Sequence, residues 1–239
     1  MCPSHVSTFP ASKANSLRRQ ASKLSDTQEN VSDGWSKSPI DPMQLLAVFR
    51  ALRIRDGFIL RAYQFRSGGN GNGLVWAMPV DAPFPEPGKC PSANDGKFAR
   101  QPKPTGALEQ VMEAIEGNGT PWSYVSASLF AREVTEFGAM WHGCDWSTHT
   151  ILGADPWITP YHRLELSPDP ESWKWKRPRP DSWEPTCEQV GGKFVVSFLT
   201  HTGLGRERIT RFVDTFREGN YRFRTKQQTV AIGPAGYIF

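Results

Sequence analysis

The stretch KFVVSFLTHT, residues 193–202, decides how the C-terminal part of this chain is expected to fold. Apolar side chains occupy both of its alternating faces, with Phe194, Val196 and Phe198 on one and Val195 and Leu199 on the other. A strand with this pattern is partly covered on both sides. Further strand-like segments follow at 208–216, 221–225 and 229–232, the first two separated by the turn residues Glu218-Gly219-Asn220. Together these segments predict an antiparallel β-meander.

A second β-structure is predicted upstream. Residues 58–65 and 74–80 are rich in aromatic and branched side chains, and they flank the glycine- and asparagine-rich residues 67–73. A phosphate-binding P-loop leads into a helix and carries Lys-Ser or Lys-Thr, whereas this loop leads into a strand and carries neither. We therefore interpret 67–73 as the tip of a hairpin, and we expect this hairpin to complete one sheet with the meander.

Three helices are predicted. Asp41 and Pro42 suit the N-cap and the first turn of a helix that ends near Arg53. In 108–116, apolar residues recur at i, i+3, i+4 and i+7, which is typical of an amphipathic helix. Residues 121–141 are apolar on most sides, and this pattern predicts a helix in the centre of the core.

These elements predict an α+β fold in which a mainly antiparallel sheet packs against a central buried helix and one or two amphipathic helices. The sheet would consist of the N-terminal hairpin and the C-terminal β-meander. Residues 41–239 are expected to form a single domain with proline-rich loops at 81–104 and 153–185. Residues 1–40 are rich in serine, lack an acid before Asp26 and show no hydrophobic periodicity, which predicts a disordered N-terminal tail. Their composition also resembles that of an organelle transit peptide.

The composition predicts a soluble protein with no membrane partner. Hydrophobic residues make up 38% of the chain, the net charge is +4, and no apolar run approaches the ~20 residues that span a bilayer. The four cysteines are scattered without a CxxC pair, so we expect reduced thiols. We expect a cytoplasmic location, or an organelle stroma or matrix if residues 1–40 are a transit peptide.

Glu133 is the best single carboxylate candidate for a functional acid. At helical spacing it lies with Trp122, Leu129 and Phe137, inside the apolar stripe of the predicted core helix. A buried carboxylate needs a cation, a metal or a hydrogen-bonded water, or its pKa rises. A structural ion pair with an arginine is the commoner outcome, and a functional acid is the alternative.

The richest cluster of reactive residue types follows that helix at 141–149, WHGCDWSTH. His142, Cys144 and His149 could supply three zinc ligands, but the spacing is not that of a structural zinc site, and we assign no metal ligand. Cys144 could instead form a thiolate pair with His149 or His162, oriented by Asp145. The simplest interpretation is a structural turn plugged by its tryptophans. The hypothetical catalytic set is Glu133, His142, Cys144, Asp145 and His149, and the sequence does not identify a cofactor.

Two basic segments are candidate binding sites. Trp173, Lys174, Trp175 and Arg177 interleave bases with aromatic rings, as the grooves that bind single-stranded nucleic acids do. In the segment 221–226, Tyr221 and Phe223 are expected to face inward, and Arg222 and Arg224 outward with Lys226. A solvated connector explains the first segment, and a solvent face paired with Asp214 and Glu218 explains the second.

Three functions are compatible with these patterns. The first is a non-catalytic binding or assembly module that engages a protein partner through aromatic, proline-rich loops and a basic sheet face. The second is a small hydrolase or transferase with a Cys/His/Glu site near 133–149. The third is nucleic-acid binding through the basic-aromatic segments. We favour a protein partner over nucleic acid, because no enzyme motif and no nucleic-acid-binding motif is recognisable and because tryptophans tend to mark interfaces.

Overall fold

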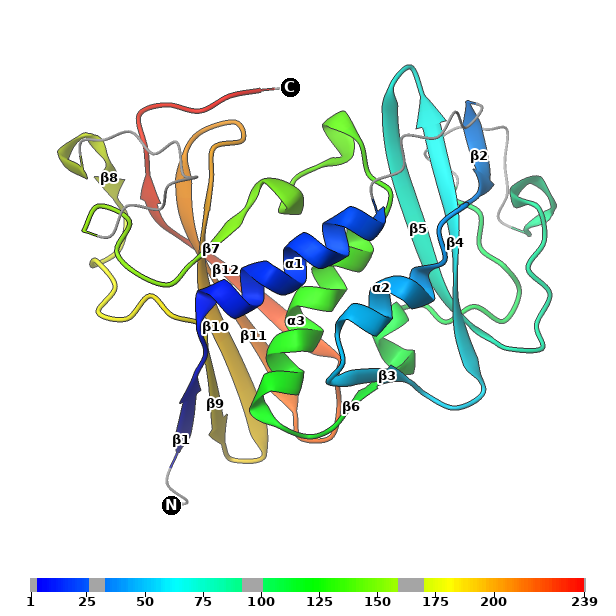
Figure 1. Ribbon diagram of the computed structural model, residues 1–239, viewed down its shortest axis with the longest axis horizontal. Helices are drawn as coiled ribbons and strands as arrows, with labels where there is room; N and C mark the ends of the chain where they lie inside the picture. Colours follow the sequence, from blue (N-terminus) through cyan, green and yellow to red (C-terminus); the bar gives the residue numbers. More distant parts are fainter. Residues whose placement is uncertain (1–3, 26–32, 92–100, 159–169, 239) are drawn as a thin grey trace. The chain divides into compact units, whose positions relative to one another are not determined.

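A computed structural model describes residues 4–25, 33–91, 101–158 and 170–238 (Figure 1). Its helices are α1 (Ala11–Ser25), α2 (Pro42–Val48) and α3 (Pro121–Thr135), with short 3-10 helices at Pro87–Lys89, Val111–Ala114, Trp141–Gly143, Trp146–Thr148 and Pro170–Ser172. The strands are β1 (His5–Thr8), β2 (Gly34–Lys37), β3 (Leu52–Ile54), β4 (Phe58–Ser67), β5 (Asn70–Pro79), β6 (Ile115–Gly117), β7 (Thr150–Leu152), β8 (Lys174–Trp175), β9 (Thr186–Val190), β10 (Lys193–Thr202), β11 (Arg208–Arg217) and β12 (Phe223–Ile232). All strand pairs are antiparallel, which confirms the mainly antiparallel α+β fold. No helix in the described ranges is both long and apolar enough to cross a membrane.

The chain divides into two compact units, where the sequence predicted one domain after residue 41. Unit 1 comprises Met1–Leu17, Gly119–Ser128 and Thr148–Phe239, and unit 2 comprises Arg18–Asn118 and Leu129–Ser147. Each unit is assembled from segments that are far apart in the sequence. The single domain after residue 41 stays a prediction, because units that interleave in this way are not separated by a linker.

Unit 1 is built on a seven-stranded sheet in the order β1-β9-β10-β11-β12-β8, with β7 also paired to β10 (Figure 1). β10, β11 and β12 form the predicted meander. α3 covers one face, where Tyr124 stacks on Phe194 and on Tyr221 with ring centroids 4.0 and 4.8 Å apart. The prediction that the buried helix packs on the meander is therefore confirmed within this unit.

The other face of this sheet is covered at one end by tryptophans. Trp173 and Trp183 are buried against side chains that include Leu199 of β10 and Ile209 of β11, and Trp157 and Trp175 pack against the same cluster. This packing corrects the expectation that the 153–185 loop offers its tryptophans to a partner. Trp173, which was predicted to bind, is only 4% exposed and is part of a second hydrophobic core.

Unit 2 contains a separate sheet in the order β2-β4-β5 and a small β3-β6 pair. The predicted hairpin is present, but it does not join the meander in one sheet. Most of residues 67–73 belong to the strands, and the turn itself is Gly68-Gly69, both with positive φ (54° and 86°), as a tight two-residue hairpin turn requires. β2 pairs with β4 on the side away from β5.

Two predicted helices differ from the structure. The helix expected at 108–116 is a single 3-10 turn followed by β6, which pairs with β3. Such a short helix is marginal alone, and strand pairing satisfies the backbone instead. α2 ends at Val48 rather than near residue 53, although its predicted cap is present, since Asp41 accepts a hydrogen bond of 2.9 Å from the Met43 amide. α3 ends at Thr135 rather than at residue 141.

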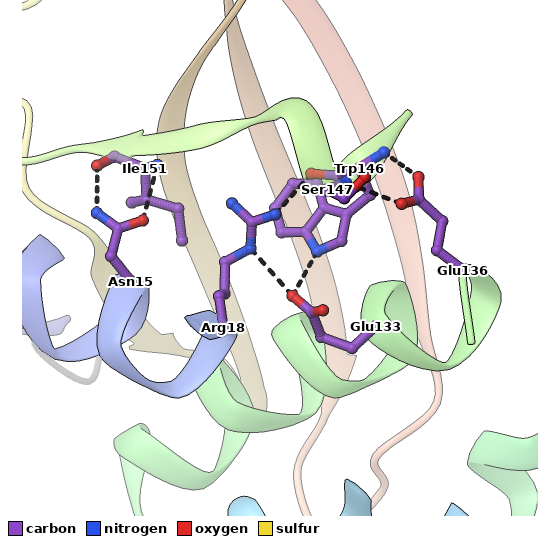
Figure 2. Close-up of polar contacts among 7 residues, drawn as sticks. All are labelled: Asn15, Arg18, Glu133, Glu136, Trp146, Ser147 and Ile151. Atoms are coloured by element: carbon purple, nitrogen blue, oxygen red, sulfur yellow. Dashed lines mark hydrogen bonds and ion pairs between the residues drawn. The ribbon is translucent and has the colours of Figure 1, made fainter. Parts of the chain in front are cut away.

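The expected disordered tail was wrong for residues 5–8, 11–25 and 34–37, which form β1, α1 and β2; residues 26–32 lie outside the described part. α1 buries a stripe at helical spacing, Ala11, Ala14, Arg18 and Ala21. Alanine contributes little hydrophobic signal, so the stripe is hard to recognise in the sequence. Within unit 1, the Asn15 side chain donates to the Ile151 carbonyl (2.8 Å) and accepts from the Ile151 amide (3.1 Å), which ties α1 to β7 (Figure 2).

Candidate functional site

Glu133 is engaged in a buried ion pair in unit 2. Its Oε1 accepts hydrogen bonds from Arg18 Nε at 3.0 Å and from the indole Nε1 of Trp146 at 2.8 Å (Figure 2). Arg18 also donates to the Trp146 carbonyl at 2.5 Å, and its guanidinium lies 4.0 Å from the centroid of the Trp146 ring. The three residues therefore form a closed network that links α1, α3 and the segment after α3.

Burial dominates the electrostatics of this pair. The side chains of Arg18 and Glu133 are each 9% exposed. Loss of hydration raises the pKa of Glu133, while Arg18 and the Trp146 indole oppose that rise, and the same loss lowers the pKa of Arg18. Glu133 already has a cationic partner, Arg18, and a neutral donor, the Trp146 indole. The geometry is therefore that of a structural ion pair rather than of a catalytic acid.

Glu136 holds the segment after α3 through its carboxylate. Its oxygens accept hydrogen bonds from three consecutive backbone amides, those of Asp145 (2.7 Å), Trp146 and Ser147 (2.8 Å). Figure 2 shows the contacts with Trp146 and Ser147. These amides open the 3-10 helix Trp146–Thr148. A carboxylate at the amide end of a helical turn satisfies donors that the turn leaves unpaired. The sequence alone did not indicate this role of Glu136.

Replacing Glu136 by alanine is expected to lower the free energy of unfolding by about 1–2 kcal/mol, because three amides lose a charged acceptor but two of their residues are exposed to water. Glu136→Gln, which keeps a neutral acceptor, should lose less. Urea unfolding followed by tryptophan fluorescence measures both. An alanine variant as stable as the natural protein would contradict the assignment.

The hairpin of unit 2 holds the segment 140–144 in place. Met140 and Gly71 exchange two backbone hydrogen bonds, and the Gly143 backbone lies so close that a Cβ there would be 2.3 Å from the Gly71 carbonyl oxygen. Trp141 has a positive φ of 50°, and it is the one non-glycine residue of the described part with such a backbone. Its side chain is 60% exposed, so the tryptophan does not plug the core as the sequence suggested. Trp146 is 6% exposed and does.

The five hypothetical catalytic residues are divided between the two units. His142 and Asp145 are exposed and Cys144 is half-buried in unit 2, whereas His149 belongs to unit 1. His149 Nδ1 shares a hydrogen bond of 2.8 Å with Thr200 Oγ1, and its ring packs edge-on against Phe212. His162, the other partner considered for Cys144, lies outside the described residues. Within the described ranges, no group of three or more His, Cys, Asp or Glu side chains could hold a metal ion.

Unit 1 instead presents a row of cations on the sheet face opposite α3. We call it the basic sheet face, and it consists of Lys193, Arg211, Arg217, Arg224 and Lys226. Lys193 lies directly opposite Arg217 across β10 and β11, and Arg224 and Lys226 lie opposite Thr215 and Val213 across β11 and β12. All are exposed except Arg211, which is half-buried. The register places one acid, Glu188 of β9, on the same face.

The acids that were expected to neutralise this face lie elsewhere. Asp214 is fully buried on the α3 side, where it accepts hydrogen bonds from Ser128 Oγ (2.5 Å) and Thr225 Oγ1 (2.7 Å). Glu218 accepts a hydrogen bond of 3.4 Å from Gln189. No ion pair joins any residue of the basic sheet face to another described residue. Asp214 and Glu218 therefore do not supply the ion pairs expected of an ordinary solvent face.

The other predicted binding residues extend along the same sheet. Arg222 is exposed just before β12, as expected, with Tyr221 buried. Lys174 and Arg177 are exposed on and after β8, which pairs with the far end of β12. Trp175 is half-buried, in contact with Trp157 and under the guanidinium of Arg179, 5.4 Å from its ring centroid. The Trp175 ring is therefore already in contact with other residues of the protein.

Sequence reasoning missed part of the basic sheet face because Lys193, Arg211 and Arg217 are spread over two strands. Only the register brings them beside Arg224 and Lys226. The period-2 alternation of each strand would have assigned faces, but not which strands are neighbours. Sequence reasoning also missed a buried polar pair in unit 1, His201 and Glu207, whose Nε2 and Oε1 are 3.9 Å apart.

Similarity to known proteins adds no further assignment for these residues. The chain was compared with family models, with curated proteins and with solved structures, and none of the three comparisons finds a match.

Proposed function

We propose that this protein is a non-catalytic binding module whose basic sheet face engages an acidic surface or segment of a protein partner. The observation that supports this proposal is the set of cations on one sheet face with no ion pair to the described residues. Lys193 and Arg217 are even placed directly opposite each other. Like charges in that position destabilise a sheet, so an acidic partner would relieve a cost that the free protein bears.

The side chains between the cations favour a protein partner over a nucleic acid. Val195, Val213 and Thr215 are half-buried and lie among the cations on the same face. Grooves for single strands need aromatic rings on which bases stack. Among the described residues of β9, β10, β11 and β12 on this face there is no Phe, Tyr or Trp, and Trp175 of β8 packs with the loop tryptophans in the second core. An acidic protein segment with small apolar side chains fits such a surface better.

The hydrolase or transferase alternative has no comparable support. Glu133 is bound by Arg18 and Trp146, and His149 is bound by Thr200 in the other unit. The expected cytoplasmic location remains a prediction that rests on the cysteine pattern.

The double variant Arg224→Gln/Lys226→Gln is expected to weaken binding of a fluorescein-labelled glutamate- and valine-containing peptide about tenfold or more, because two unpaired cations are lost. Fluorescence anisotropy at two salt concentrations measures the affinity, and the natural protein should show the steeper salt dependence. Arg19→Gln/Lys23→Gln removes the same charge from exposed positions of α1 in unit 2 and serves as the matched control.

Two results would contradict this proposal. One is equal weakening by both double variants, which would indicate only a general effect of net charge. The other is tighter binding of a single-stranded or duplex nucleic acid than of the peptide at the same salt concentration, which would favour the nucleic-acid alternative.

A further inference from the structure

We infer that the acidic partner of the proposed function docks as an added β-strand on the open edge of β12, along residues 224–229. This inference rests on the proposed function and adds the mode of recognition: an extended acidic peptide segment that pairs with the backbone of the sheet edge.

β12 is paired along its whole length on one side only. β11 pairs with it from Phe223 to Ile232. On the other side, β8 pairs only with Ala231 and Ile232, and the amides of Lys176 and Arg177 bond the Val230 carbonyl. Within the described parts of the chain, no strand and no backbone hydrogen bond covers the remaining edge at 224–229.

Exposure of the side chains agrees with an uncovered edge. Residues 224–227 and 229 are exposed and residue 228 is half-buried, so both faces of the sheet are open at this strand. Alternate residues of such a strand direct their N–H and C=O groups away from β11. An edge of this kind is a template for another extended segment, whose main-chain hydrogen bonds give affinity and whose alternate side chains give specificity.

The side chains of the edge define the chemistry of the added strand. Arg224 and Lys226 lie two residues apart on the same face, so acids at positions i and i+2 of an added strand would stand beside them. Thr225 and Gln227, on the opposite face, are neutral. A second copy of this chain would bring the same cations to the shared edge, and like charges disfavour that pairing. The added strand is therefore an acidic segment rather than β12 of a second copy.

The test uses a labelled peptide of about ten residues that alternates glutamate and valine, long enough to cover the open edge. Two derivatives carry N-methyl groups on every second amide, one on the glutamates and one on the valines. Both have the charge and composition of the parent except for those methyl groups. Because an added strand directs only alternate amides toward its neighbour, one derivative should bind at least about tenfold more weakly, while the other should stay within about threefold of the parent. Each derivative is the control for the other.

Hydrogen exchange supplies a second readout on the whole protein. Addition of the parent peptide should slow exchange of amides within residues 224–229, because they gain hydrogen bonds, and should leave the hairpin of unit 2 unchanged.

The outcomes separate the inference from the function on which it rests. If both N-methylated peptides bind as well as the parent, or if exchange at 224–229 does not slow, while Arg224→Gln/Lys226→Gln still weakens binding, strand addition is overturned and the binding proposal stands. If the peptide binds the natural protein and the double variant equally, the binding proposal fails first.

Discussion

Glu133→Ala is expected to lower the free energy of unfolding by about 3–5 kcal/mol, the largest effect among the substitutions considered. The variant leaves the guanidinium of Arg18 without its carboxylate in a site where the side chain is 9% exposed, and it leaves the Trp146 indole without its acceptor. A buried charge that has lost its partner retains its full desolvation penalty. Urea unfolding at neutral pH measures the change.

Two comparisons test the cause. Glu116→Ala breaks the Arg53–Glu116 pair, which is shorter (2.6 Å) but has side chains 67% and 38% exposed, and it should cost no more than about 1 kcal/mol. Arg18→Met/Glu133→Leu replaces the buried pair by apolar side chains and should recover much of the loss. If Glu133→Ala costs no more than Glu116→Ala, the pair does not stabilise the fold as described.

His201 is expected to make the protein less stable in acid by about 3 kcal/mol between neutral pH and pH 4. Burial lowers the pKa of His201 from 6.5 to about 4, with Glu207 opposing the shift and His149 adding to it. The folded protein therefore holds His201 neutral at pH values where the unfolded chain protonates it. The unfolded chain then binds more protons, so stability falls as the pH falls from about 6.5 towards 4.

The matched variant for this prediction is His201→Gln, which cannot take up a proton. Urea unfolding of both proteins at neutral pH and near pH 4.5 isolates the contribution of His201 to the loss of stability, because the carboxyl groups titrate in both proteins. The natural protein should lose more stability over this interval than His201→Gln. His142→Gln, which removes an exposed imidazole, should behave like the natural protein. Equal losses in the natural protein and in His201→Gln would contradict the prediction.

The elements that the sequence predicted best are those with local signals. The meander follows from alternating apolar residues, the hairpin from two branched segments around Gly68-Gly69, and α2 from its Asp41-Pro42 cap. Each signal lies within the element that it specifies. The burial of Glu133 also followed from helical spacing. The expectation of an arginine partner followed in turn from that burial, because a buried carboxylate needs a partner.

What the sequence could not supply are relations between distant segments. The partner of Glu133 is Arg18, 115 residues away in a stretch whose buried residues are mostly alanines. The basic sheet face depends on which strands are neighbours, and Asp214 was misplaced because its neutral partners, Ser128 and Thr225, carry no charge signal. The helix predicted at 108–116 failed for the same reason, since pairing with β3 overrides a short apolar period.

The interleaving of the two units has a consequence for the order in which the chain can fold during synthesis. Unit 2 has all of its segments once Ser147 has been made, whereas unit 1 needs both Met1–Leu17 and the C-terminal strands. β1 pairs with β9, and the first amide of α1 bonds a carboxylate 173 residues further along. Residues 5–11 must therefore wait for residues 184–189 to be synthesised before they find their partners. A chain that began at Asp41 would lack β1 and α1, and Glu133 would lose the guanidinium that neutralises it.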